Sequence, residues 1–157
     1  MNKICQAHPA APASVASPPE SAKMEVVVIY TGVKQTLAAL RAAAGLAQGL
    51  SARIRLVVPQ PVPFPAQLDQ PPVQKDFAER KFRTLAADSG IDTNVEIRLC
   101  RDWQTGALHD LKPGSTVVIG ARMRWWPGLR ERRLARALRA RGHQVLLVDS
   151  NKETRNA

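Results

Sequence analysis

The residues best suited to acid–base chemistry in this sequence are His109 and its acidic neighbours. Asp110 follows His109 directly, and Asp102 precedes it by two helical turns. An imidazole beside a carboxylate can act as a general acid or base. Both acids, however, flank a short predicted helix, where Asp102 would cap the first turn and His109 would be a surface residue. We favour this structural interpretation over catalysis.

The remaining nucleophiles and metal ligands are isolated from one another. Ser115 and Ser150 lack the turn that exposes a catalytic serine, and the histidines show no metal-ligand spacing. Cys5 and Cys100 form no CxxC pair, which argues against a zinc site or a disulfide framework. We therefore predict no catalytic residues and no metal site, in a protein of the reducing cytoplasm.

A basic segment carries most of the net charge of +10. Between Arg122 and Arg141 there are eight arginines and a single acid, Glu131. On a helical wheel, one stripe is formed by Arg132, Arg136 and Arg139, and another side is apolar, with Leu134, Ala135 and Leu138. The predicted anion patch is this arginine stripe together with Arg124 in the preceding loop. The segment is either a solvated helix face or a patch for nucleic acid or an acidic protein. Helix-turn-helix and zinc-finger patterns are absent.

Two tryptophans and a proline-rich stretch each allow two interpretations. Trp125 and Trp126 lie among the arginines, where they would stack on bases or, in the interpretation that we favour, pack against the sheet end and the proline-rich stretch. Residues 59–72 include six prolines, which predicts an extended loop. That loop is either a binding lid or a tolerated insertion.

The order of apolar and amphipathic segments predicts a single doubly wound α/β domain. The predicted strands are residues 25–30, 53–58, 94–100, 116–120 and 145–149. They alternate with predicted helices at residues 35–50, 73–89 and 104–111 and in the basic segment. This alternation is typical of a mainly parallel sheet with helices on both faces. The domain would cover residues 24–150, between an unstructured Ala/Pro-rich tail (1–23) and a polar C-terminal tail (151–157). With no apolar run long enough for a bilayer, we expect no membrane partner.

The order and spacing of these segments resemble the universal stress protein family over about residues 24–149. The resemblance is carried by the turn Thr31-Gly32-Val33 after the first strand, by the valines and proline that end the second, and by the last two strands around the basic helix. It implies a role in the stress response. It also implies a homodimer formed through the final strand, between Val145 and Val148, where an apolar edge needs a partner.

The glycine loop that binds ATP in this family is degenerate here. Family members carry Gly, two residues, Gly, nine residues, then Gly-Ser or Gly-Thr. Gly120 matches the first glycine, but the second falls on Met123. The Gly-Ser pair falls on Arg133-Leu134, or on Glu131-Arg132 if the loop is shorter. An acid usual after the first strand is replaced by Thr31. We therefore expect no cofactor and no binding of ATP by the usual loop, which leaves ATP only as the alternative given below.

Ligands of doubly wound sheets bind beyond the carboxyl ends of the strands. The candidate binding residues there are Thr31, Gly32, Val58, Gly120, Arg122 and Met123. Three hypotheses follow. The leading one is a non-catalytic regulatory or stress-response module. The second is an anion- or nucleic-acid-binding module that uses the basic segment. The third is an ATP- or AMP-binding protein with a rearranged loop, in which Arg122 and Arg124 hold the anion.

Overall fold

The computed structural model describes residues 24–68, 75–88, 90–122 and 129–151. Strands and helices alternate along the chain: β1 Glu25–Ile29, α1 Val33–Leu50, β2 Arg53–Pro61, α2 Lys75–Asp88, β3 Thr93–Cys100, α3 Trp103–Leu108, β4 Thr116–Ala121, α4 Leu129–Ala140 and β5 Gln144–Asp149. The predicted N-terminal tail and residues 152–157 of the predicted C-terminal tail lie outside the described residues.

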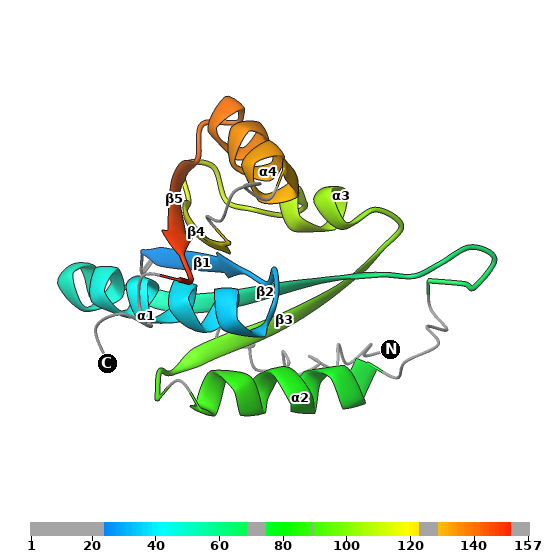
Figure 1. The fold of residues 1–157 in the computed structure, drawn as a ribbon, viewed down its shortest axis with the longest axis horizontal. Helices are drawn as coiled ribbons and strands as arrows, with labels where there is room; N and C mark the ends of the chain where they lie inside the picture. The colour runs from blue at the N-terminus through cyan, green and yellow to red at the C-terminus, as the bar shows by residue number, and fades with distance from the viewer. Residues whose placement is uncertain (1–23, 69–74, 89, 123–128, 152–157) are drawn as a thin grey trace, which may run out of the picture.

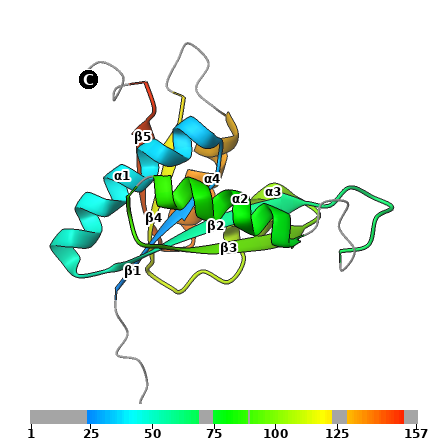
Figure 2. The same ribbon diagram turned by 90° about the horizontal axis from the view of Figure 1, so that it is seen from below.

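The five strands form one sheet in the order β3-β2-β1-β4-β5, and every neighbouring pair is parallel. From β1 the chain builds outward to β2 and β3, then returns to the other side of β1 with β4 and β5. Helices α1 and α2 cover one face of the sheet, and α3 and α4 cover the other (Figures 1 and 2). The predicted doubly wound fold is confirmed, and its switch point lies between β1 and β4.

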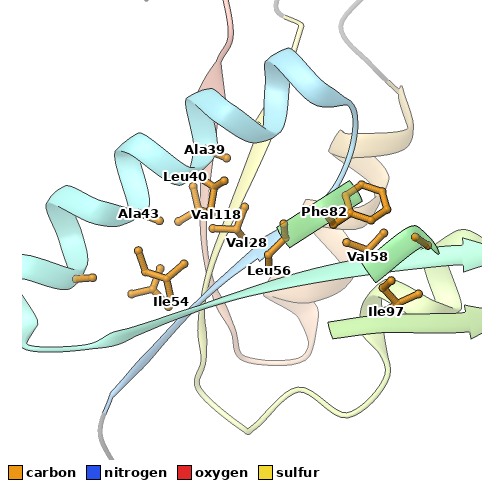
Figure 3. Close-up of a cluster of buried hydrophobic side chains, with 13 residues drawn as sticks. Val28, Ala39, Leu40, Ala43, Ile54, Leu56, Val58, Phe82, Ile97 and Val118 are labelled. Carbon is orange, nitrogen blue, oxygen red and sulfur yellow. The ribbon is translucent and has the colours of Figure 1, made fainter. Parts of the chain in front are cut away.

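The central strand β1 is buried on both faces, which explains its unbroken β-branched sequence. Val26 and Val28 point into the core beneath α1 and α2, and Val27 and Ile29 into the core beneath α3 and α4. Figure 3 shows the first core, in which Leu40 of α1 and Phe82 of α2 lie over Val28, Leu56 and Val118. The second core contains Trp103, Ala107, Leu134, Ala135 and Leu138 from the two helices.

Strand β2 continues three residues beyond its predicted end, into the proline-rich stretch. The prediction that the extended loop begins at Pro59 is therefore wrong, since Pro59, Gln60 and Pro61 pair with β3. The amide of Tyr30 donates to the carbonyl of Val57, which places the odd-numbered residues of β2 on the β1 side. Because β1 has already ended there, the donors missing from the two prolines leave no ladder bond unmade.

Helix α3 is shorter than predicted: it ends at Leu108, whereas the predicted helix ended at residue 111. His109 is extended and Asp110 has a φ of 52°, so neither can continue the helix. At this end the buried guanidinium of Arg98 donates to the carbonyl oxygens of His109 and Asp110. A cation at the C-terminus of a helix stabilises the carbonyl groups that lack helical partners.

Arg98 also ends a row of alternating charges that crosses three strands. Glu25 of β1 pairs with Arg55 of β2 at 3.2 Å, and Arg55 pairs with Glu96 of β3 at 3.0 Å. The Nε atom of Arg98 lies 2.7 Å from the other carboxylate oxygen of Glu96. Burial alone would raise the pKa of Glu96, but the hydrogen bonds and charges of Arg98 and Arg55 together lower that pKa below its ordinary value.

This lowered pKa predicts an acid-sensitive contribution to stability. A carboxyl whose pKa is lower in the folded state stabilises the fold above its unfolded pKa, and that stability is lost as the pH falls through the folded pKa. We expect the free energy of unfolding to fall between about pH 5 and pH 3. The Glu96→Gln variant should show a smaller loss over this interval in urea unfolding followed by circular dichroism. An equally steep pH dependence in the variant would contradict the assignment.

Candidate functional site

At the switch point, a side-chain hydrogen bond connects the turn after β1 to β4. The hydroxyl of Thr31, two residues beyond β1, donates to the carbonyl oxygen of Gly120 in β4 at 2.7 Å. The amide of Thr31 lies 3.4 Å from the hydroxyl of Thr36, and the amide of Thr36 donates to the carbonyl of Gly32 at 2.8 Å. The residue that replaces the usual acid thus ties β4 to the start of α1.

Gly120 is required by the packing of α1 on the sheet. A Cβ atom at this position would lie 1.9 Å from the carbonyl oxygen of Gln35 and 2.4 Å from its carbonyl carbon. These are backbone atoms of the first turn of α1, so they cannot rotate away. The glycine that matches the family's nucleotide loop therefore has a structural role that is independent of any ligand.

A cavity of about 480 Å³ opens at this crevice. It is lined by Thr31, Gly32, Val33, Lys34, Gln35, Arg122 and Glu131. Helix α1 begins here after Gly32 with no side-chain cap, and its first turn contains no acid, so within the described residues neither feature neutralises the positive end of the helix dipole. The amides, Lys34 and Arg122 favour a small anion, whereas the carboxylate of Glu131 opposes a chain of phosphates.

The structure separates the residues that the sequence predicted to bind a ligand. Thr31, Gly32 and Arg122 line the cavity at the switch point. Val58 instead lines a neighbouring cavity of about 380 Å³, together with Tyr30 and aromatic side chains of α2. Met123, Arg124, Trp125 and Trp126 lie outside the described residues.

Four residues that line the switch-point cavity were not among the predicted binding residues: Val33, Lys34, Gln35 and Glu131. Lys34 belongs to it because α1 begins at Val33, two residues earlier than predicted, so Lys34 stands in the first turn. The signal was present in the strand–turn–helix order, since the first turn after a switch-point strand faces the crevice. Glu131 reaches the cavity from the first turn of α4.

The acid–base candidates line a third cavity, between β3 and α3. This cavity of about 560 Å³ is bordered by Asp102, His109 and Asp110, with Cys100 beside them. Asp102 caps α3 as predicted, and its carboxylate accepts from the amide of Thr105 at 2.8 Å. This bond and one from the Thr105 hydroxyl lower the pKa of Asp102. Within the described residues, the His109 side chain has no hydrogen bond to either carboxylate.

Cys100 is poorly suited to nucleophilic chemistry. Its side chain is buried, and both this burial and the nearby charge of Asp102 raise the pKa of the thiol. A thiol with a raised pKa stays protonated at neutral pH and is a weak nucleophile. Among the described residues, histidine, cysteine, aspartate and glutamate form no group of three or more that could hold a metal ion.

The arginines of α4 divide into two sets. The guanidinium of Arg130 lies 3.6 Å from the ring centre of Trp103 in α3, and that of Arg139 donates to the carbonyl of Val145 in β5 at 3.1 Å. The second set, which we name the outer arginine face, is exposed and makes no hydrogen bond or ion pair with another described residue; it consists of Arg132, Arg133 and Arg136. Arg139, which the sequence placed in the anion patch, thus has a structural contact. Arg133, which was not predicted for the patch, is exposed together with Arg132 and Arg136.

The fold and its crevice define a doubly wound α/β domain with a ligand-sized cavity at the β1–β4 switch point. Two solved structures are similar to it. A universal stress protein from Archaeoglobus fulgidus has a TM-score of 0.54 and 16% identity, over 80% of this chain and 93% of that one. A protein of the universal stress protein family from Burkholderia pseudomallei has a TM-score of 0.48 and 19% identity, over 83% of this chain and 98% of that one. The chain has the fold of universal stress proteins.

Comparisons of sequence alone add no relative. No protein-family model and no curated protein matches this chain. No helix within the described part of the chain has the length and apolar character needed to cross a membrane.

The contact between Gly120 and α1 predicts an effect on stability without any ligand. Gly120→Ala should lower the free energy of unfolding by about 3 kcal/mol or more, because the new methyl group overlaps backbone atoms. Gly45→Ala is the matched control, since Gly45 lies within α1 with no atom within 4 Å of an added Cβ. That change should raise stability by about 0.5–1 kcal/mol. Chemical unfolding of both purified variants measures the difference, and equal stabilities would refute the contact.

Proposed function

We propose that this protein is a non-catalytic regulatory module with the universal stress protein fold, and that it works without ATP held by a glycine loop. The observation that carries this proposal is the composition of the switch-point cavity. The backbone of α1 packs directly against Gly120, and the hydroxyl of Thr31 donates to the carbonyl of Gly120. The carboxylate of Glu131 lines the cavity. Gly120 thus has a packing role, Thr31 stands where the family has an acid, and Glu131 adds a negative charge where phosphate would lie.

The magnitude of the charge effect supports this proposal. At an effective dielectric constant of about 20, two unit charges 4 Å apart interact with about 4 kcal/mol. An acid within the cavity therefore offsets much of what one cation, Lys34 or Arg122, contributes toward a phosphate chain. With Glu131 present, the charged side chains of the lining sum to one positive charge instead of two, so a phosphate chain gains less from this cavity than from a site lined by the two cations alone.

A role in signalling rather than catalysis is supported by the state of the reactive groups. Cys100 is buried with a raised thiol pKa, and the carboxylate of Asp102 is engaged in capping α3. Neither group is held ready for proton transfer or nucleophilic attack. The similar fold of the Archaeoglobus fulgidus protein favours a stress-response role for this chain.

We further propose that the module acts as a homodimer joined through β5, in a cytoplasmic setting. Strand β5 is an outermost strand of the sheet, and Leu146 on it is 41% exposed. The amides of Gln144 and Ser150 bond to β4, so the odd-numbered residues present their backbone groups to the free edge. The guanidinium of Arg139 covers one of these groups, the carbonyl of Val145, and would be displaced when two edges pair.

The nucleotide prediction is tested by thermal unfolding with ATP and magnesium. A site with a dissociation constant of 10 µM would gain about 2.7 kcal/mol at 1 mM ATP, which raises the melting temperature by several degrees. We expect no such shift in the wild type. The Glu131→Gln variant should bind inorganic phosphate more tightly than the wild type in isothermal titration calorimetry. A shift of several degrees with ATP that disappears in Lys34→Glu and Arg122→Glu would overturn the proposal.

The dimer prediction is tested by light scattering coupled to size-exclusion chromatography at micromolar concentration. The wild type should elute as a dimer, and Leu146→Lys should be monomeric because a lysine on an edge strand opposes strand pairing. Arg139→Ala should dimerise more tightly, since the carbonyl of Val145 is then free to pair. A monomeric wild type would reject the proposal, as would weaker dimerisation of Arg139→Ala.

A further inference from the structure

The outer arginine face is a concentrated positive surface on the exposed side of α4. Arg132, Arg133 and Arg136 are exposed on α4 and make no hydrogen bond or ion pair with another described residue. The other arginines of this helix show what a structural role looks like. Arg130 stacks on the buried ring of Trp103, and Arg139 covers a backbone carbonyl of β5. The fold itself gives no such role to the three outer residues.

The placement of these three residues follows from the packing of α4 on the sheet. Leu134, Ala135 and Leu138 are buried against the core that α4 shares with α3, and they fix the rotation of the helix. The outer arginines therefore lie on the side of α4 opposite its buried residues, where they are exposed. With a rise of about 1.5 Å per residue, Arg132 and Arg136 stand about 6 Å apart along the helix axis.

The chemistry of the face favours the phosphate backbone of a nucleic acid. The cations are all arginines, whose planar guanidinium groups bind phosphate oxygens with two parallel hydrogen bonds. Each strand of a DNA duplex carries one phosphate about every 3.4 Å of its axis, so a patch of this length meets two or three of them. The first turn of α4 carries the one acid of the helix, Glu131, which lines the switch-point cavity rather than this face.

Two other partners fit the same face less well. A membrane-binding helix buries an apolar side among lipids, but the apolar side of α4 is already buried in the protein core. A tight protein interface needs a central apolar or aromatic anchor. Among the described residues of α4, the large exposed apolar side chain is Leu129, one turn before Arg132 and Arg133 at the N-terminal end of the helix, so it lies at the edge of the face rather than at its centre.

We propose that the outer arginine face binds the phosphate backbone of nucleic acid without reading its sequence. The face has three guanidinium groups and no exposed amide or aromatic side chain between them that would contact bases. Binding of this kind is governed by the release of counterions, so it weakens steeply with salt. The proposal goes beyond the proposed regulatory function and does not depend on the state of the nucleotide cavity.

The test uses the full chain and a fluorescein-labelled DNA duplex of mixed sequence, with fluorescence anisotropy measured from 50 to 200 mM salt. The triple variant Arg132→Gln, Arg133→Gln, Arg136→Gln should bind at least about tenfold more weakly at the low-salt end. The slope of log affinity against log salt should fall in magnitude by about 2–3, one for each lost phosphate contact. Far-ultraviolet circular dichroism and thermal unfolding should be unchanged, because these side chains are exposed and make no hydrogen bond or ion pair with another described residue.

The matched control removes the same charge from another exposed helix face. Arg80→Gln, Lys81→Gln, Arg83→Gln on α2 also removes three positive charges, from side chains that are likewise exposed. This control should keep most of the affinity and the salt slope of the wild type. Equal losses in the two triple variants would overturn the proposal, because net charge rather than a defined face would then govern binding.

Two further outcomes would also overturn the proposal. One is the absence of duplex binding by the wild type at low salt. The other is binding of poly-glutamate as tight as that of the duplex and equally dependent on the outer arginine face, which would assign the face to an acidic protein. A change of ATP-dependent melting in any of these variants would concern the regulatory proposal instead, so the two proposals fail separately.

Discussion

The close approach of β4 to the first turn of α1 is the constraint on which the rest of this structure depends. With no side chain at Gly120, the backbone of Gln35 comes within contact distance of the sheet, and Thr31 can bond to the carbonyl of Gly120. This contact fixes where α1 begins, and α1 in turn covers the centre of the sheet above Val28 and Val118. The shape of the switch-point crevice is a consequence of that packing.

The crevice combines an ordinary scaffold with an unusual lining. The start of α1, without a side-chain cap, and the cations Lys34 and Arg122 would attract an anion, but Glu131 reaches the same cavity from α4. The carboxylate of Glu131 therefore weakens the attraction that the two cations would exert on an anion in this cavity. A glycine retained for packing also shows why a partial match to a nucleotide loop is weak support for nucleotide binding.

The basic helix shows how packing separates structural charges from available ones. Arg130 lies over an aromatic ring and Arg139 lies against the edge strand, so both contribute to holding α3, α4 and β5 together. The same rotation of α4 directs Arg132, Arg133 and Arg136 away from the protein. A single amphipathic segment thus stabilises the fold with one part of its charge and leaves another part exposed.

The sequence by itself determined the element order, the doubly wound class and both buried faces of β1, because periodicity and β-branched runs are local properties of the chain. It also identified the cap formed by Asp102, which needs a hydrogen bond across a single turn. Only the tertiary structure decided that Gly120 serves packing, that Val58 lines a different cavity from Thr31, and that Arg139 contacts β5. The physical reason is that these contacts join residues from different elements, whose distances depend on how the helices rotate and pack on the sheet.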